Sequence, residues 1–321
     1  MTMYLSHMTA LECWRSGRFD ALLAARDAES AFGNPASPRD RACKPLASIV
    51  SSLAERGLGF VSAPVHVLVP GTIARNGCAR VHCHVCTRKL PTGAFVRLAE
   101  GLYVSSPELC FVQMATQFTF FDLVQLGFEL CGTYAKRPGG VTRYGRPLLL
   151  TTVSALERFL DDAGSLPGVV AARKALKHVA ACSASPRETV LTMLLCLPPR
   201  LGGYGLSHPI LNHRINVGRA KRAATEKDYY LCDLYWPRAR LDLEYESDEY
   251  HTGSVRISED SARRDDLAYL GISVKTMTHR QIMNPVRFDK VARQLAFALG
   301  ARIRDRESSL AARRALRAAV L

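Results

Sequence analysis

The spacing of hydrophobic positions changes along the first half of the chain. Up to about residue 55 the spacing is helical, with a polar break at residues 33–40, and from Pro64 short alternating runs such as "PVHVLVP" and "AFVRLAEGLYVSS" predict strands. Helical spacing returns at "SSPELCFVQMATQ", where Ser106 is a candidate N-cap and Pro107 suits the first turn. We therefore expect a helical segment at 1–60, a small β-rich unit with a helix at 61–135, and a helical bridge at 136–184.

The second half of the chain predicts one larger domain, at 185–321. Ser185, Pro186 and Glu188 have the spacing of a capped helix start. Two strands, "YYLCDLYWP" and "RARLDLEYES", turn near Pro237, and a charged helix then ends at Gly271 before the strand "ISVKTMTH". A closing helix and a basic amphipathic tail complete the chain. The order helix, strand, strand, helix, strand, helix predicts an α/β or α+β class.

Composition narrows the class of protein and of partner. Hydrophobic residues make up 48% and charged residues 22%, which are ordinary globular values, and no apolar run reaches the roughly 18 residues of a membrane span. The first residues lack the pattern of a secretory signal and the ten cysteines are scattered, so we expect a cytoplasmic protein with reduced thiols and no membrane contact. The net charge of +14 suits a nucleic-acid partner or merely a soluble basic surface.

Negative charge is concentrated on one predicted strand of this basic protein. Five of the eight residues from Asp242 to Glu249 are acidic. Since side chains alternate across a strand, Asp242, Glu244 and Glu246 share one face, and Asp233 on the preceding strand can reach it. Such repelling charges suit a Mg²⁺ site, because this cation is held by carboxylates, water and phosphate. A solvated edge strand, whose charges discourage pairing with other chains, explains the same pattern.

The order of these residues resembles a nuclease family. Asp233, ten intervening residues and Glu244-Tyr245-Glu246 are similar to the Asp…(Asp/Glu)-x-Lys core of the PD-(D/E)XK nuclease superfamily. The branch related to very-short-patch-repair endonucleases is closer, since there a D-x-x-W-P strand precedes E-x-D-G, a His and a basic helix that ends in Gly. Over about 185–290 the matching positions are Asp233, Trp236, Pro237, Glu244, Glu246, His251, Arg263, Arg264, Asp265 and Gly271.

The resemblance implies a restriction-endonuclease-like mixed sheet flanked by helices, acting as a Mg²⁺-dependent DNA endonuclease. Asp233 and Glu244 would hold the metal, with Glu246 in support. His251 or a metal-bound hydroxide would perform the proton chemistry, and Glu188 occupies the place of a Glu on the family's first helix. The phosphate would be steadied by a cation from the set Arg263, Arg264 and Lys275.

Departures from the family pattern favour a second function. Glu246 stands where the superfamily has its Lys, and Ser247 replaces the usual Gly, so Lys275 or Arg264 would have to supply the missing charge. Domains of this kind also occur at the C-terminus of multi-domain bacterial proteins similar to abortive-infection type IV antitoxins, whose N-terminal part is a DNA-binding regulator. That likeness implies a non-catalytic regulator, with a partner toxin and a nuclease-like scaffold.

Several of the candidate residues also have simpler explanations. Glu188 completes a capping box with Ser185, His251 suits an ordinary surface position, and Arg263 with Arg264 suits a solvated helix face. The stretch "CARVHCHVCTRK" contains zinc-type ligands, but a second ligand pair is missing and His82 and His84 face away from Cys83 on a strand, so we expect no zinc there. The loop "LGGYGL" follows a helix and is expected to be a flexible connection.

Overall fold

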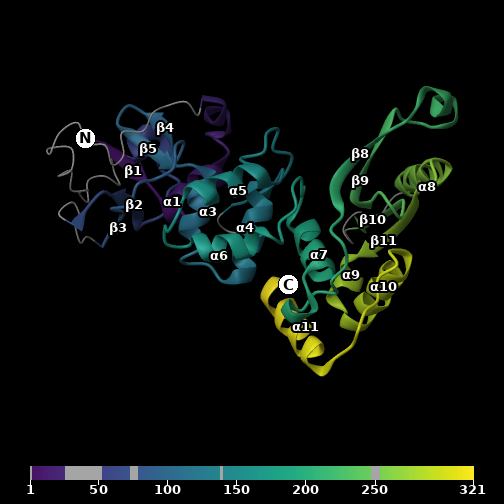
Figure 1. Cartoon of the computed structure of the whole chain (residues 1–321). Coiled ribbons are helices and arrows are strands. Elements are labelled where there is room, and N and C mark those ends of the chain that lie inside the picture. The colour runs from purple at the N-terminus through teal and green to yellow at the C-terminus, as the bar shows by residue number, and fades with distance from the viewer. Residues whose placement is uncertain (1, 26–52, 73–78, 138–139, 247–253) are drawn as a thin grey trace. The chain divides into compact units, whose positions relative to one another are not determined.

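The computed structural model describes residues 2–25, 53–72, 79–137, 140–246 and 254–321 (Figure 1). Contacts within the chain divide it into two compact units, Met1–Val179 and Ala180–Leu321, called here the N-terminal and C-terminal units. Each unit combines helices with a sheet that contains both parallel and antiparallel pairs. The α+β class expected from the order of elements is therefore confirmed.

A five-stranded sheet with the order β3-β2-β1-β5-β4 forms the centre of the N-terminal unit. The strands are β1 (Met3–Leu5), β2 (Val65–Val69), β3 (Val81–Val85), β4 (Phe95–Ala99) and β5 (Leu102–Ser105). The helices are α1 (His7–Ser16), α3 (Pro107–Met114), α4 (Phe120–Leu130), α5 (Val153–Asp162) and α6 (Val169–Leu176), with shorter helical turns at Asp20–Ala25 and Ala54–Leu58 and a small ladder of β6 (Ala135–Lys136) and β7 (Thr142–Arg143).

The start of the chain differs from the helical segment predicted there. Residues Met3–Leu5 form β1, which pairs parallel with β5 and antiparallel with β2 and so lies in the middle of the sheet. Three residues are too few to show an alternating pattern, and their partners lie more than sixty positions away. By contrast, the helix start at Ser106 is confirmed, since its side chain accepts the N–H of Leu109 and Pro107 lies in the first turn.

The C-terminal unit is built on a four-stranded sheet with the order β11-β10-β9-β8. Its strands are β8 (Ile210–Asn216), β9 (Tyr229–Trp236), β10 (Leu241–Glu246) and β11 (Ser273–Thr278). Its helices are α7 (Pro186–Cys196), η6 (Pro199–Leu201), η7 (Arg219–Ala224), α8 (Ser254–Tyr269), α9 (His279–Met283), α10 (Pro285–Ala298) and α11 (Glu307–Val320). Only β10 and β11 pair in parallel, and α7 and α8 are drawn on different sides of the sheet (Figure 1).

The predicted turn near Pro237 and the strand "ISVKTMTH" are both confirmed, whereas β8 was not expected. Its sequence, "ILNHRIN", carries polar residues at adjacent positions and is half exposed, so it shows no clear alternation. It pairs antiparallel with the whole length of β9. Together, β8 and β9 form a hairpin that carries the helical turn η7 at its tip (Figure 1).

Strands β8 and β9 keep one register around Asp233, since Leu211 pairs with Leu234 and His213 pairs with Cys232. Asn212, between these two pairs, has a positive φ of 48°, a conformation that Asn tolerates better than most residues. Cys232 and Tyr235 of β9 belong to a core cluster that also contains Leu267 of α8 and Leu270, which directly follows that helix.

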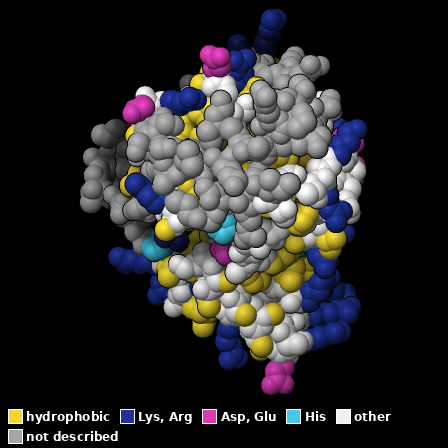
Figure 2. Space-filling model, turned by 90° about the vertical axis from the view of Figure 1, so that its left-hand side faces the viewer, with side chains coloured by type: hydrophobic (Ala, Val, Ile, Leu, Met, Phe, Trp, Pro, Cys, Tyr) yellow, Lys and Arg dark blue, Asp and Glu magenta, His cyan; other side chains and the backbone are white. Residues whose placement is uncertain are grey.

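Positive charge is not gathered at one place on the face drawn in Figure 2. Lys and Arg side chains are distributed around the edge of that view, with hydrophobic side chains between them. Each helix that the structure describes is too short or too polar to cross a bilayer. Net charge alone therefore does not locate a partner.

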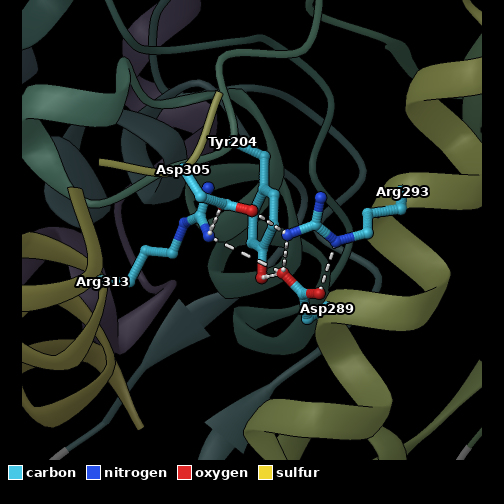
Figure 3. A network of polar contacts seen from close by, with 5 residues as sticks. All are labelled: Tyr204, Asp289, Arg293, Asp305 and Arg313. Carbon is cyan, nitrogen blue, oxygen red and sulfur yellow. Dashed lines mark hydrogen bonds and ion pairs between the residues drawn. The ribbon is translucent and has the colours of Figure 1, made fainter. Parts of the chain in front are cut away.

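A polar network attaches the C-terminal helix to the rest of its unit (Figure 3). Arg313 of α11 lies 3.0 Å from Asp305 and 3.6 Å from Asp289 of α10, and its guanidinium carbon is 4.1 Å from the ring centroid of Tyr204. The Tyr204 hydroxyl donates to Asp289 over 3.0 Å, and Arg293 pairs with both aspartates. The predicted basic tail is thus a docked helix.

The docked helix also explains the loop "LGGYGL", which was expected to be only a flexible connection. Gly202 has a φ of +90°, and a Cβ there would lie 2.3 Å from the carbonyl oxygen of Ala312 in α11. A Cβ at Gly203 would lie 1.9 Å from the carbonyl oxygen of Leu197. The glycines are required by close backbone approach, so this loop is a packing surface.

We predict that Arg313→Ala loosens α11. The substitution leaves Asp289 and Asp305 short of a partner and removes a cation from the Tyr204 ring, for an expected loss of about 1–3 kcal/mol in the free energy of unfolding. Denaturant unfolding and amide exchange along α11 measure the effect. Arg314→Ala, at an exposed position of the same helix, is the matched control and should change stability by less than about 0.5 kcal/mol. Equal effects of the two substitutions would show that the network does not hold the helix.

Candidate functional site

Most of the predicted site residues lie on four elements of the C-terminal unit, namely two paired strands and two helices. Asp233 is on β9, and Asp242, Glu244 and Glu246 are on β10, which pairs with it. Glu188 lies in the first turn of α7, and Arg263 and Arg264 lie on α8. His251 lies outside the described residues. We call Glu188, Asp233, Asp242 and Glu244 the carboxylate cluster.

Asp233 is the half-buried member of the cluster on β9. Its Oδ2 accepts the backbone N–H of Tyr245 over 3.1 Å, so the side chain reaches across to β10 as expected. Burial, followed by the negative charge of Glu188, raises the pKa of Asp233 from 3.8 to about 7. A carboxyl group in this state is partly protonated at neutral pH.

Glu188 serves as a cap and as a neighbour of Asp233 at the same time. Its Oε1 accepts the Ser185 hydroxyl over 2.9 Å, and its Oε2 accepts the Ala184 N–H over 2.8 Å and the Asn212 side chain over 2.6 Å. The Ser185 hydroxyl oxygen accepts the Glu188 N–H over 3.1 Å, so the predicted N-cap is confirmed. The return bond of the capping box differs from the prediction, because the Glu188 carboxylate accepts the N–H of Ala184. Burial raises the pKa of Glu188, while these hydrogen bonds lower it.

Asp242 lies at the bottom of the cluster and is fully buried. Neither of its carboxylate oxygens has a hydrogen-bond partner of good geometry among the described residues. Burial, and then the charge of Glu244, raises the pKa of Asp242 from 3.8 to about 8. The side chain is therefore mainly protonated at neutral pH, since an unpaired buried charge is costly.

Glu244 is paired with Arg263 of α8. Arg263 donates to Glu244 Oε1 through Nε over 3.1 Å and through Nη2, and Nη2 also donates to the Leu231 carbonyl of β9. Burial lowers the pKa of Arg263, but the adjacent Glu244 carboxylate outweighs it and the net shift is upward. Both hydrogen bonds to Glu244 end on the same carboxylate oxygen, so the Arg263 guanidinium neutralises Glu244 through Oε1.

The other predicted cations lie away from the cluster. Arg264 is exposed and donates to the Asp260 carbonyl of its own helix. Lys275 on β11 is the register partner of Leu243, so it lies on the face opposite that of Glu244. Neither side chain therefore supplies charge beside Glu244. Glu246 is half-buried at the end of β10.

The residues of the cluster do not fit a Mg²⁺ ion as they are arranged. In the described ranges, no group of three or more His, Cys, Asp or Glu side chains is placed to hold a metal ion. Both oxygens of Glu188 accept hydrogen bonds, Glu244 is paired with Arg263, and Asp242 is buried. Binding at Asp233 and Glu244 requires Arg263 to move, and the magnesium assignment stays a prediction.

Four histidines of the N-terminal unit form a second cluster, which sequence reasoning found only in part. The His7 and His84 rings stack with centroids 3.5 Å apart, His82 and His84 are 4.5 Å apart, and His66 Nδ1 is 2.9 Å from His84 Nε2. His66 is the register partner of His82 on the parallel strand. The shared pattern "VHVLV" and "VHCHV" could have indicated this pairing, whereas nothing in the sequence places His7 beside them.

His7 is buried at the start of α1, with a positive φ of 48° and its N–H donated to Gln113 Oε1 over 2.9 Å. Burial, and then the neighbouring His84, His66 and His82, lowers the pKa of His7 from 6.5 to about 2. Burial and His82 also lower the pKa of His66. His7 and His66 are therefore mainly neutral at neutral pH.

Comparison with protein-family models, with curated proteins and with solved structures finds no match to the chain.

We predict that Asp242→Asn stabilises the protein at alkaline pH. A carboxyl group whose pKa is raised from 3.8 to about 8 opposes folding increasingly as the pH rises through that interval. The neutral amide removes this effect, so at pH 8 the variant should gain more than about 1 kcal/mol in unfolding free energy. Denaturant unfolding at pH 4.5 and pH 8 tests this, and the advantage of the variant should be clearly smaller at pH 4.5 than at pH 8. A variant less stable than wild type at pH 8 would contradict the burial of a protonated Asp242.

We predict that His7 makes the N-terminal unit sensitive to acid. Above pH 6.5 the imidazole is neutral in both states, whereas below it the unfolded chain binds a proton that the folded chain does not, because the folded pKa is about 2. Between pH 7.5 and 5.5 this linkage should cost about 1.4 kcal/mol. Asn tolerates the positive φ at this position, so in His7→Asn this part of the loss should be absent from the amide exchange of α1. His178→Asn, outside the cluster, is the control and should keep the wild-type pH dependence.

Proposed function

We propose that the C-terminal unit is a nuclease-type domain that binds DNA and, with Arg263 in its present position, does not hydrolyse it. The pairing of Arg263 with Glu244 carries this proposal, because it occupies the carboxylate that a hydrolytic metal would need. A mixed four-stranded sheet preceded by α7 and interrupted by α8 is compatible with the restriction-endonuclease-like arrangement. The net charge of +14 favours a polyanionic partner.

A second candidate function, Mg²⁺-dependent DNA hydrolysis, is favoured by one specific feature. The pKa values of Asp233 and Asp242 are raised to about 7 and about 8, partly by the other carboxylates of the cluster. Raised carboxyl pKa values in a shared site are typical of functional centres as well as of structural networks. This candidate requires Arg263 to leave Glu244 when DNA and metal bind.

Incubation of the purified protein with supercoiled DNA and Mg²⁺ or Mn²⁺ separates the two candidates. We expect no cleavage, together with salt-dependent binding to duplex DNA. Asp233→Asn and Glu244→Gln are tested in parallel. Cleavage by the wild type that both substitutions abolish would establish the hydrolytic candidate instead, and cleavage that survives both would indicate a contaminating nuclease. Absence of binding to any DNA would overturn the proposed function.

A further inference from the structure

The hairpin of β8 and β9 carries a concentration of exposed basic side chains. Five of them lie between Arg214 and Asp228, compared with two acidic residues, Glu226 and Asp228, in the same segment. The exposed basic residues are Arg214, Arg219, Lys221, Arg222 and Lys227. Three of these belong to the helical turn η7 at the tip of the hairpin, which extends away from the sheet (Figure 1).

Contacts with α8 hold this hairpin in one position. Asp266 of α8 accepts the Glu226 N–H over 3.1 Å and also the hydroxyl of Tyr230. Val217 and Tyr230 belong to the core cluster with Leu267 and Leu270. The Lys221 ammonium lies 5.1 Å from the ring centroid of Tyr269. The basic side chains are therefore presented by a fixed support, which reduces the entropy lost on binding.

The cations of the hairpin are only weakly neutralised within the chain. Arg222 pairs with Asp228 over 3.1 Å, but both side chains are more than half exposed, so the pair contributes little. Arg214 lies over the Tyr229 ring at 3.8 Å, which orients its guanidinium without removing its charge. Among the described residues, Arg219 and Lys227 form no ion pair.

From this geometry we propose that the hairpin, including its tip, contacts the phosphate backbone of duplex DNA beside the carboxylate cluster. The proposal rests on the DNA binding proposed above and names the surface that performs it. From Asp233 to Tyr229 the strand extends by about 13 Å. Phosphates of one DNA strand follow one another every roughly 3.4 Å of the duplex axis, so this span corresponds to about four phosphates of one strand. A duplex that lies along the hairpin from its tip would then pass the cluster.

Two triple variants with the same change in net charge test this surface. The first is Arg219→Gln, Lys221→Gln, Arg222→Gln at the tip. The second, the control, is Arg302→Gln, Arg304→Gln, Arg306→Gln, at exposed positions between α10 and α11 of the same unit. Fluorescence anisotropy gives the Kd for a duplex of about 25 base pairs at several salt concentrations, and circular dichroism verifies that each variant is folded.

We expect the tip variant to bind at least about tenfold more weakly than the control variant. The slope of log Kd against log salt should fall by about 2–3, as expected for two or three lost phosphate contacts. Equal weakening in both triple variants would show a general charge effect and overturn the hairpin surface while leaving DNA binding intact. A wild-type protein that binds anionic lipid vesicles but not DNA would overturn both the hairpin surface and the proposed function.

Discussion

The pairing of the Arg263 guanidinium with the Glu244 carboxylate is the contact on which the C-terminal unit depends. Four carboxyl groups meet between α7, β9 and β10, and without a cation they would repel one another in a poorly solvated place. Arg263 also donates to the Leu231 carbonyl, so one side chain ties α8 to both β9 and β10. Since Asp266 of the same helix anchors the hairpin, this contact also helps to position the basic tip.

The parts of the fold that sequence predicts best are those specified by local chemistry. Ser106 and Ser185 begin helices because their hydroxyls accept backbone N–H groups one turn later. Strand β1 depends instead on partners far away in the chain, and its three residues carry too little pattern to predict a strand. Strand β8 was missed because, as half of an exposed hairpin, it has polar residues at neighbouring positions.

The candidate site was predictable in its members but not in its pairing. Alternation correctly indicates that Asp242 and Glu244 are neighbours, whereas the contacts of Asp233 with Tyr245 and Glu188 depend on strand pairing and on the packing of α7. The helical register of α8 brings Arg263, and not Arg264, to Glu244. The histidine cluster shows the same limit, since His66 and His82 meet through strand pairing and His7 through packing of α1.

The carboxylate cluster requires positive charge whichever function it serves, and the physical question is which cation supplies it. Arg263 already pairs with Glu244. Breaking a fully buried ion pair costs about 3–5 kcal/mol, and this partly buried pair should cost less. A divalent ion at Asp233 and Glu244 must offset that cost, and Glu188 cannot become a further ligand unless it gives up its hydrogen bonds. Under the proposed DNA binding, phosphate groups beside the cluster would lower the first cost, because a guanidinium fork that leaves Glu244 could then bind a phosphate. Charge balance would in that case link DNA contact at the hairpin to cation exchange at Glu244.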